Sequence, residues 1–205
     1  MEGIEASGKT TLAHGLQERL LADGIEPLMT REPGGTTVGD RLRALLLNGP
    51  GSLDPVTELF IVCAARAEHV ASVIAPALAA RRFVLCDRYS DATRAYQGGG
   101  RGLDDAMVAT ACHYAERGVR PHLTLLVDVP PEISRERVAA RTHESGVPQD
   151  RLERENDVFH VRVRERYLQI ARDEPDRVKI LDGTQSPAAV AEAGWAQLAP
   201  LIGRA

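Results

Sequence analysis

The sequence is poor in cysteine and has no long apolar run. Its three cysteines, Cys63, Cys86 and Cys112, are widely spaced among 205 residues and form no C-x-x-C pair. An odd number of cysteines without such a pair argues against both a disulfide framework and a zinc site. No apolar run approaches the ~20 residues that cross a bilayer, and the first residues carry no signal-peptide core. We therefore expect a cytoplasmic protein with no membrane partner.

An excess of positive charge is also missing. The formal net charge is -4, so no basic field covers the molecule, and tight binding of nucleic acid through phosphate neutralisation is disfavoured. Lysine is scarce as well, because only Lys9 and Lys179 are lysines among the 25 basic residues. A single arginine is therefore weakly informative here, whereas a lysine within a glycine-rich loop stands out.

The length of 205 residues and the 43% hydrophobic content predict a single domain over residues 1–205. Helical patterns alternate with short apolar runs, which indicates an α/β fold with a mainly parallel sheet. The predicted strands are 28–31, 83–87, 123–129 and 178–182. Leu12, Leu16 and Leu20 mark a first helix that ends at Gly24, and Val38, Leu42, Leu45 and Leu46 mark a second that ends at Gly49. The later predicted helices are 55–80, 103–117, 132–141, 156–172 and 188–201. Residues 143–149 interrupt the pattern and predict a mobile lid, placed at about 142–152.

Residues 3–10 read Gly-Ile-Glu-Ala-Ser-Gly-Lys-Thr and fit the phosphate-binding pattern G-x-x-x-x-G-K-[ST]. The glycines let backbone N–H groups approach and wrap phosphates. Lys9 is placed to neutralise the transferring phosphate and Thr10 to hold Mg²⁺, while the following helix directs its N-terminus at the anion. The pattern predicts a nucleotide-binding loop; the alternative is an accidental turn.

A phosphate-binding loop of this type normally follows a buried strand. Only Met1 and Glu2 precede Gly3 in the sequence. In such folds that strand is central, so we expect the first strand to be missing from the chain as written, with a trough in the middle of the sheet.

Charged residues follow two of the predicted strands. Asp87 and Arg88 end the strand 83–87, at the edge where ligands meet an open α/β sheet. Asp87 is a candidate for Mg²⁺ and Arg88 for a phosphate, the alternative being a strand-end ion pair. Arg31 and Glu32 follow the strand 28–31 and begin a Pro-Gly-Gly run, which alone would indicate only a turn.

Further polar groups lie on helices and loops. Arg66 falls on the apolar stripe of the long helix and is either paired with an acid such as Glu58 or a phosphate ligand. Residues 95–102 supply a phenol, an amide and four glycines, which suits either the reading of a base edge or a flexible loop. Arg137 and Arg141 precede the lid on one helix face, and Arg151 and Arg154 follow it, so lid closure could bring an arginine to a transferred phosphoryl group. A solvated basic face is the alternative.

Taken in order, these motifs resemble the bacterial thymidylate kinase family, within the P-loop nucleoside monophosphate kinases, over essentially the whole chain. The most specific are Glu2-Gly3 with the loop, residues 30–36, Ala64-Ala65-Arg66, Asp87-Arg88-Tyr89 and residues 95–102. The resemblance implies a five-stranded parallel sheet with helices on both faces and a short lid. It implies transfer of the γ-phosphoryl group of ATP to dTMP, with Mg²⁺, in a homodimer.

The resemblance also implies roles for individual residues. ATP would contact Gly3, Ile4, Glu5, Ala6, Ser7, Gly8, Lys9, Thr10, Thr11 and Gln185. The acceptor nucleotide would contact Glu5, Glu32, Arg43, Arg66, Arg88, Thr93, Tyr96 and Gln97. Thr10 and Asp87 would hold the metal. Residues 5–7 contain no arginine, so the catalytic set would be Lys9, Arg88 and a lid arginine, with Arg151 as first choice and Arg141 as second.

One position departs from the family pattern. Four residues before the motif arginine the family often has a phenylalanine that stacks on thymine, and this chain has Val62, with Phe60 two residues away. Two alternatives to a dTMP kinase remain. One is a deoxynucleoside kinase, which Arg43, Arg66 and the Arg31-Glu32 turn disfavour, and the other is an inactive nucleotide-binding module that lacks its central strand. Neither a D-x-x-G run after a strand nor an Asn-Lys-x-Asp base reader is found, which argues against a switch GTPase.

Overall fold

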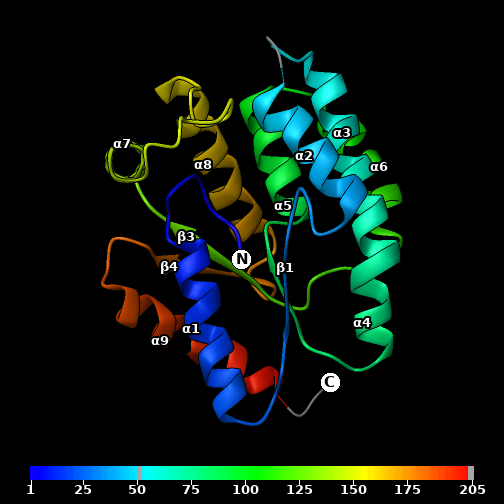
Figure 1. Ribbon diagram of the computed structural model, residues 1–205, viewed down its shortest axis with the longest axis vertical. Coiled ribbons are helices and arrows are strands. Elements are labelled where there is room, and N and C mark those ends of the chain that lie inside the picture. Colours follow the sequence, from blue (N-terminus) through cyan, green and yellow to red (C-terminus); the bar gives the residue numbers. More distant parts are fainter. Residues whose placement is uncertain (50–51, 203–205) are drawn as a thin grey trace.

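A computed structural model describes residues 1–49 and 52–202 (Figure 1). Its strands are β1 (Leu28–Arg31), β2 (Val84–Asp87), β3 (Thr124–Asp128) and β4 (Val178–Asp182). The α-helices are α1 (Lys9–Ala22), α2 (Thr37–Asn48), α3 (Pro55–His69), α4 (Ala75–Ala79), α5 (Ser90–Thr93), α6 (Asp105–Glu116), α7 (Pro131–Ser145), α8 (Asp157–Asp173) and α9 (Pro187–Leu198). Two π-helical turns, η1 (Val70–Ile74) and η2 (Arg94–Gly100), and a 3-10 turn, η3 (Ala199–Leu201), complete the described elements. The four predicted strands are confirmed within two residues at each end.

The strands form two parallel pairs, β1 with β2 and β3 with β4. The first residues of the chain lie between these pairs and bond to both. Met1 N donates to Cys86 O at 2.7 Å, and Arg88 N donates to Met1 O at 2.9 Å. Glu2 N donates to Leu125 O at 2.8 Å, and Val127 N donates to Glu2 O at 2.9 Å. The order across the fold is therefore β1, β2, residues 1–2, β3, β4.

Helices cover both faces of this arrangement, as the alternation of side chains along β3 requires. Leu125 and Val127 pack in one cluster with Leu12 and Leu16 of α1 and with residues of α9. Leu126 packs in another cluster with residues of α8 and η2. Figure 1 shows α1 and α9 side by side below the strands and α8 above them. The α/β class with parallel strands is therefore confirmed.

An apolar groove of about 400 Å³ continues the line of Met1 between the two strand pairs. Its walls include Phe83 and Leu85 on the β2 side, Leu123 and Leu125 on the β3 side, and Leu16 beneath. The groove lies on the opposite side of residues 1–2 from the glycine loop, so it is separate from the cavity described below.

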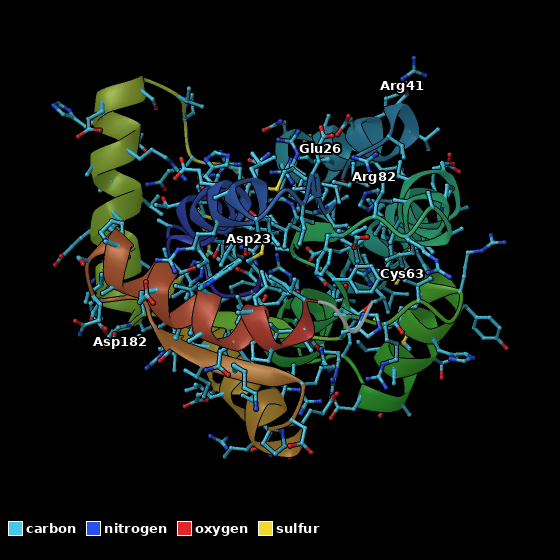
Figure 2. All side chains as sticks on the ribbon, turned by 90° about the horizontal axis from the view of Figure 1, so that it is seen from below. Asp23, Glu26, Arg41, Cys63, Arg82 and Asp182 are labelled. Atoms are coloured by element: carbon cyan, nitrogen blue, oxygen red, sulfur yellow. The ribbon has the colours of Figure 1, made fainter. Side chains whose placement is uncertain are left out.

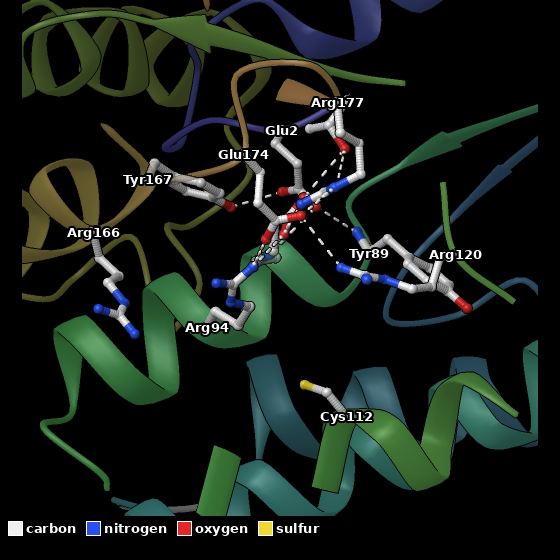
Figure 3. Close-up of polar contacts among 12 residues, drawn as sticks. Glu2, Tyr89, Arg94, Cys112, Arg120, Arg166, Tyr167, Glu174 and Arg177 are labelled. Atoms are coloured by element: carbon white, nitrogen blue, oxygen red, sulfur yellow. Dashed lines mark hydrogen bonds and ion pairs between the residues drawn. The ribbon is translucent and has the colours of Figure 1, made fainter. Parts of the chain in front are cut away.

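A polar network joins Asp91 and Arg94 to Glu174 and Arg177 (Figure 3). Asp91, which is 5% exposed, accepts from both terminal nitrogens of Arg177 at 2.7 and 2.9 Å. Glu174 accepts from Arg94 at 2.6 Å and from Arg177 at 2.7 Å. The two guanidinium groups hold the pKa of Glu174 down at about 2. This network ties α5 and η2 to the end of α8 and to the start of β4.

Three expectations differ from the structure. The alternative of a flexible loop at 95–102 is wrong, because Arg94–Gly100 form the turn η2 and most of its residues are buried. The acid that pairs with Arg66 is Glu32 and not Glu58, at 2.7 Å between Nε and Oε2. The proposed lid at 142–152 begins inside α7, which continues to Ser145, so only the part from Gly146 is irregular. Whether this segment moves stays a prediction.

One helical stretch, Pro55–Ala79, is long and apolar enough to cross a membrane by length and composition alone. It comprises α3, η1 and α4. The stretch carries Glu58, Arg66 and His69, which are 0%, 2% and 0% exposed and are hydrogen-bonded inside the fold. Buried charges with partners are typical of a core helix, since a lipid-facing helix would leave them unpaired.

Charged side chains cover the outside of the fold, as Figure 2 shows for Arg41 and Asp182 at the periphery. The same view places Cys63 among the helices, where it is 8% exposed. All three cysteines are free, as expected from their spacing.

Candidate functional site

The glycine loop leads directly into α1. Gly3 has φ of 140°, and a Cβ there would lie 2.4 Å from Val127 O, so only glycine fits between the loop and β3. Gly8, with φ of 105°, precedes the helix and supplies no side-chain cap. By contrast, Thr36, Asp54, Asp104, Asn156 and Ser186 cap α2, α3, α6, α8 and α9 with side-chain oxygens. The first N–H groups of α1 thus need an acceptor from outside the chain, and they face the loop where a phosphate fits.

Lys9 lies folded into the loop. Its Nζ donates to Ile4 O at 2.7 Å and contacts Ser7 Oγ at 3.4 Å, and the residue is 7% exposed. Burial, and after it the neighbouring charge of Arg88, lowers the pKa of Lys9 to about 8. A bound phosphate would supply the negative charge that this ammonium group lacks. This position in the loop allows Lys9 to form an ion pair with a bound phosphate.

Asp87 and Thr10 meet beside the loop. Thr10 Oγ1 donates to Asp87 Oδ2 at 3.2 Å, while Asp87 Oδ1 is buried with no hydrogen-bond partner among the described residues. No group of three or more His, Cys, Asp and Glu side chains that could hold a metal ion is found among residues 1–49 and 52–202. A single free carboxylate oxygen beside a hydroxyl fits Mg²⁺, which keeps several waters and binds substrate phosphates. It does not fit an ion that needs a full set of protein ligands.

Arg88 lies on the other side of the loop and is held in a strained conformation, with φ of 69°. Its Nη1 donates to Gly3 O at 2.9 Å, and its Nη2 donates to Glu5 Oε1 and to Tyr96 Oη, each at 3.1 Å. Tyr96 Oη in turn donates to Glu5 Oε1 at 2.6 Å. Burial opposes ionisation of Glu5, but Arg88 and Lys9 outweigh it and lower the pKa of Glu5. Arg88 thus links the loop to η2.

Arg66 is held by a second buried carboxylate. Its Nε donates to Glu32 Oε2 at 2.7 Å, and its Nη2 donates to Thr93 Oγ1 at 2.9 Å. Glu32 is itself fixed by His69, whose Nδ1 lies 3.0 Å from Oε1, and His69 Nε2 lies 2.6 Å from Thr30 Oγ1. Arg66, Glu32 and His69 are each at most 3% exposed. The guanidinium group is therefore rigidly oriented before any ligand binds.

These groups line one cavity of about 450 Å³. The predicted site residues that line it are Glu5, Ala6, Ser7, Gly8, Lys9, Thr10, Thr11, Glu32, Arg43, Arg66, Asp87, Arg88, Thr93, Tyr96, Gln97 and Arg141. Four predicted residues do not line it: Gly3, Ile4, Gln185 and Arg151. Gly3 and Ile4 form the base of the loop. Gln185 is exposed in the turn after β4 and donates to Asp182 Oδ2 at 2.8 Å.

The lid arginines differ in their contacts. Arg141 lines the cavity, its side chain is 52% exposed, and Nη2 contacts Glu153 Oε1 at 2.5 Å. Arg151 is turned away from the cavity. Its Nη1 contacts Glu58 Oε2 at 2.8 Å, its Nε donates to Leu46 O at 2.8 Å, and its side chain is 10% exposed. In this conformation Arg151 fastens the lid to α3 and α2.

Three leucines that line the cavity were missed from sequence. Leu46, Leu47 and Leu152 form an apolar wall of the cavity together with Val62, the position that departs from the family pattern. Each of the three is an aliphatic residue within or beside a helix, so no local signal separates it from core residues. Arg137, named from sequence beside Arg141, also lines the cavity. Its Nη2 donates to Gly183 O at 3.0 Å, which joins the loop rim to the turn after β4.

Comparison with known proteins agrees with this geometry. The profile of the thymidylate kinase family matches residues 1–193. The chain is 45% identical over 204 residues to a thymidylate kinase of Geotalea uraniireducens strain Rf4, covering 97% of this chain and 96% of that protein. It is 46% identical over 206 residues to a thymidylate kinase of Pseudomonas fluorescens strain SBW25, covering 100% and 96%. A thymidylate kinase of Synechococcus sp. strain JA-2-3B'a(2-13) is 47% identical over 202 residues, covering 98% and 94%. On its sequence and on the arrangement of its loop, arginines and cavity, the chain belongs to the thymidylate kinase family.

Proposed function

We propose that the protein is a thymidylate kinase, which transfers the γ-phosphoryl group of ATP to dTMP and yields ADP and dTDP. The observation that carries this proposal is that a phosphate loop with its lysine and two pre-oriented arginines, Arg66 and Arg88, line the same cavity. The loop can bind the phosphates of ATP, and the two arginines can bind the phosphate of a second nucleotide. A deoxynucleoside kinase, whose acceptor is uncharged, would need only the loop.

The donor side of the cavity binds and orients the phosphates of ATP. Backbone N–H groups of the loop and of α1 surround the β- and γ-phosphates, and Lys9 leaves Ile4 O to pair with them. Thr10 and the free oxygen of Asp87 are the residues that would hold Mg²⁺, which supplies charge neutralisation between the phosphates when bound. The exposed turn with Gln185 is where the adenine would rest.

The acceptor side holds dTMP. Arg43 and Arg88 face its phosphate, and Arg66, Thr93 and Gln97 face its base. Tyr96, which is 4% exposed and hydrogen-bonded to Glu5, fills the place of a ribose 2′-hydroxyl and favours deoxy substrates. The charges of Arg66 and Arg88 are fixed by the buried carboxylates of Glu32 and Glu5, so little reorganisation of these two side chains accompanies the binding of the second anion.

The arginine that meets the transferring phosphoryl group is assigned to the lid. The sequence places Arg151 first, but the contacts favour Arg141, because it lines the cavity and its side chain is 52% exposed although it pairs with Glu153. Arg151 would have to leave a buried carboxylate to do the same. Charge spread over the equatorial oxygens is what this arginine stabilises.

The remaining assignments concern the fold and its setting. We propose one domain with a lid at about 142–152, a cytoplasmic location and a homodimer through α3, on which Phe60 is 59% exposed. We also propose a five-stranded sheet whose middle strand runs through the apolar groove in line with Met1. Backbone groups of residues two apart in a strand point to the same side. Met1 N donates to Cys86 O, so the backbone groups of Val84 in β2 face the groove. Glu2 N donates to Leu125 O, so the backbone groups of Leu123, next to β3, face the groove as well.

The proposed function is tested by the choice of acceptor. With ATP and Mg²⁺ we expect turnover of dTMP in a coupled assay of ADP release, weaker turnover of dUMP, and none of thymidine, since thymidine offers no phosphate to Arg43 and Arg88. Turnover of thymidine without turnover of dTMP would establish the deoxynucleoside kinase instead. Binding of ATP without any turnover would establish an inactive nucleotide-binding module.

The pKa of Lys9 sets a pH limit on the binding of ATP. Its pKa of about 8 lies below the ordinary value of 10.5, so the free enzyme loses this charge as the pH rises through about 8. We expect kcat/KM for ATP to be constant near pH 7 and to be about tenfold lower at pH 9. In a Lys9→Arg variant the guanidinium stays charged, so its lower activity should not fall in that range. A wild-type profile that stays flat to pH 9 would contradict the assignment.

The two lid arginines are separated by alanine variants. We expect Arg141→Ala to lower kcat by about 10²-fold or more, with little change of the melting temperature, since its side chain is half exposed. Arg151→Ala should lower the melting temperature by several degrees, because Glu58 loses a buried partner. A loss of kcat confined to Arg151→Ala would restore Arg151 as the catalytic arginine.

The groove predicts a gain of stability from an added strand. A five-residue segment rich in valine and isoleucine, placed ahead of Met1, should pair with Val84 and Leu123 and raise the melting temperature by about 3 °C or more, which corresponds to about 1 kcal/mol. A Ser-Gly segment of the same length is the control and should have no effect. Equal melting temperatures for the two extended proteins would show that the groove accepts no strand.

A further inference from the structure

The structure contains a buried carboxylate that the proposed reaction does not use. Glu58 lies in the first turn of α3 and is 0% exposed. It does not line the cavity. Its contacts all come from donors: Gln97 Nε2 at 2.6 Å, Arg151 Nη1 at 2.8 Å, and Arg101 Nη2 at 3.1 Å. The guanidinium groups of Arg101 and Arg151 therefore balance the charge of Glu58, and the amide of Gln97 donates one further hydrogen bond to it.

We propose that Glu58 is a positioning residue that fixes the amide of Gln97 and so decides which pyrimidine the acceptor site selects. This inference rests on the proposed function, because it concerns the base of the acceptor nucleotide. It assigns to the site a preference for bases with a carbonyl group beside a ring N–H, namely thymine and uracil, over cytosine.

The first step is the orientation of Gln97. A carboxylate only accepts hydrogen bonds, whereas an amide has a donor end and an acceptor end. At a separation of 2.6 Å from Glu58, Gln97 must present its Nε2 and not its oxygen, because two oxygen atoms would repel each other there. Gln97 Oε1 is thereby turned to the other side. This oxygen has no hydrogen-bond partner within the described residues, and Gln97 lines the cavity.

The second step is the placement of Arg66 relative to Gln97. Arg66 Nη2 donates to Thr93 Oγ1 at 2.9 Å, and Thr93 precedes Gln97 by four residues, about one helical turn, along α5 and η2. Arg66 and Gln97 both line the cavity. A guanidinium group has only donors. The wall that faces the base therefore offers a donor from Arg66 and an acceptor from Gln97.

The third step is the match to a base. Thymine and uracil present the carbonyl oxygen of C4 beside the N–H of position 3, which is the complement of a donor beside an acceptor. Cytosine presents an amino group beside an unprotonated ring nitrogen, which reverses both. A site built on such hydrogen bonds rejects the reversed pattern strongly, since each polar group is left facing its own kind.

The experiment compares dTMP and dCMP as acceptors in wild type and in Glu58→Gln. In the variant, Arg101 and Arg151 donate to the amide oxygen of the new side chain, so its amide nitrogen faces Gln97. The amide of Gln97 then flips, which directs its oxygen to position 58 and its nitrogen into the cavity. We expect kcat/KM to fall for dTMP and to rise for dCMP, so that the ratio of the two falls at least about tenfold. A merely structural role for Glu58 would lower both values together.

Two matched variants complete the test. Glu58→Asp keeps a group that only accepts, so it should keep the wild-type ratio even where both rates are lower. Arg101→Gln removes another partner of Glu58 without changing the carboxylate, and it should also keep the ratio. If Glu58→Gln alone does not fold, the double variant Glu58→Gln with Arg101→Met takes its place in the test, because it removes one buried charge of each sign. The same fall in the ratio is expected for the double variant.

The outcomes separate this inference from the proposed function. Wild-type turnover of dTMP with an unchanged ratio in the folded Glu58→Gln protein would overturn the role of Glu58 and leave the function standing. An equal fall of the ratio in Glu58→Asp would also overturn it. Absence of wild-type turnover with every monophosphate would overturn the proposed function itself.

Discussion

The site depends on how residues 1–2 are held between two pairs of strands. Four backbone hydrogen bonds fix this segment to β2 and β3, and Gly3 follows with a conformation that only glycine tolerates so close to Val127. The side chain of Glu2 strengthens the join, because it accepts from Tyr89 N at 2.7 Å and from Tyr167 Oη at 2.8 Å. Burial, with the nearby charge of Asp91, raises the pKa of Glu2 to about 7.

That raised pKa has a consequence for stability. The folded state binds the proton of Glu2 more tightly than the unfolded state, whose value is near 4.5, so this group favours folding most at low pH. Its contribution is lost as the pH rises from about 4.5 towards 7. The hydrogen bonds from Tyr89 and Tyr167 limit the loss, since they stabilise the carboxylate. The carboxyl group of Glu2 is therefore costly to bury, but its hydrogen bonds to Tyr89 and Tyr167 help to fix the start of the glycine loop.

Buried glutamates recur as supports of the site. Glu5 holds Arg88, Glu32 holds Arg66, and Glu58 holds Gln97. Pairs of this kind contribute little net stability, but removal of one partner leaves a buried charge alone and costs about 3–5 kcal/mol. Their effect is on direction: each carboxylate occupies one side of its partner and leaves the opposite side for a ligand. Orientation is thus fixed in the free protein.

The local parts of this arrangement could be predicted from the sequence. The glycine loop carries its own spacing, and the strand ends at Asp87 and Glu32 follow from apolar runs. The pairing of Arg66 with Glu32 could not be predicted, because it joins residues 34 positions apart through the fold. The helical turn η2 was also missed as a structure, since its glycines indicate a loop. A Cβ on Gly99 or Gly100 would lie 2.6 Å from Arg166 Cβ or 2.5 Å from Phe159, so glycine there permits close helix packing.

The position of Val62 bears on how the base is chosen. Val62 lines the cavity, whereas Phe60 is 59% exposed and points elsewhere, so no aromatic ring of α3 reaches the base. Stacking adds about 0.5–1.5 kcal/mol beyond the area that a ring buries, and every base has a face to stack, so it contributes affinity more than selectivity. Hydrogen bonds discriminate more strongly, because a mismatched base leaves buried groups unpaired. With valine in place of the ring, the proposed function leaves selection among pyrimidines to Arg66 and Gln97, so the carboxylates that orient these two side chains gain in importance.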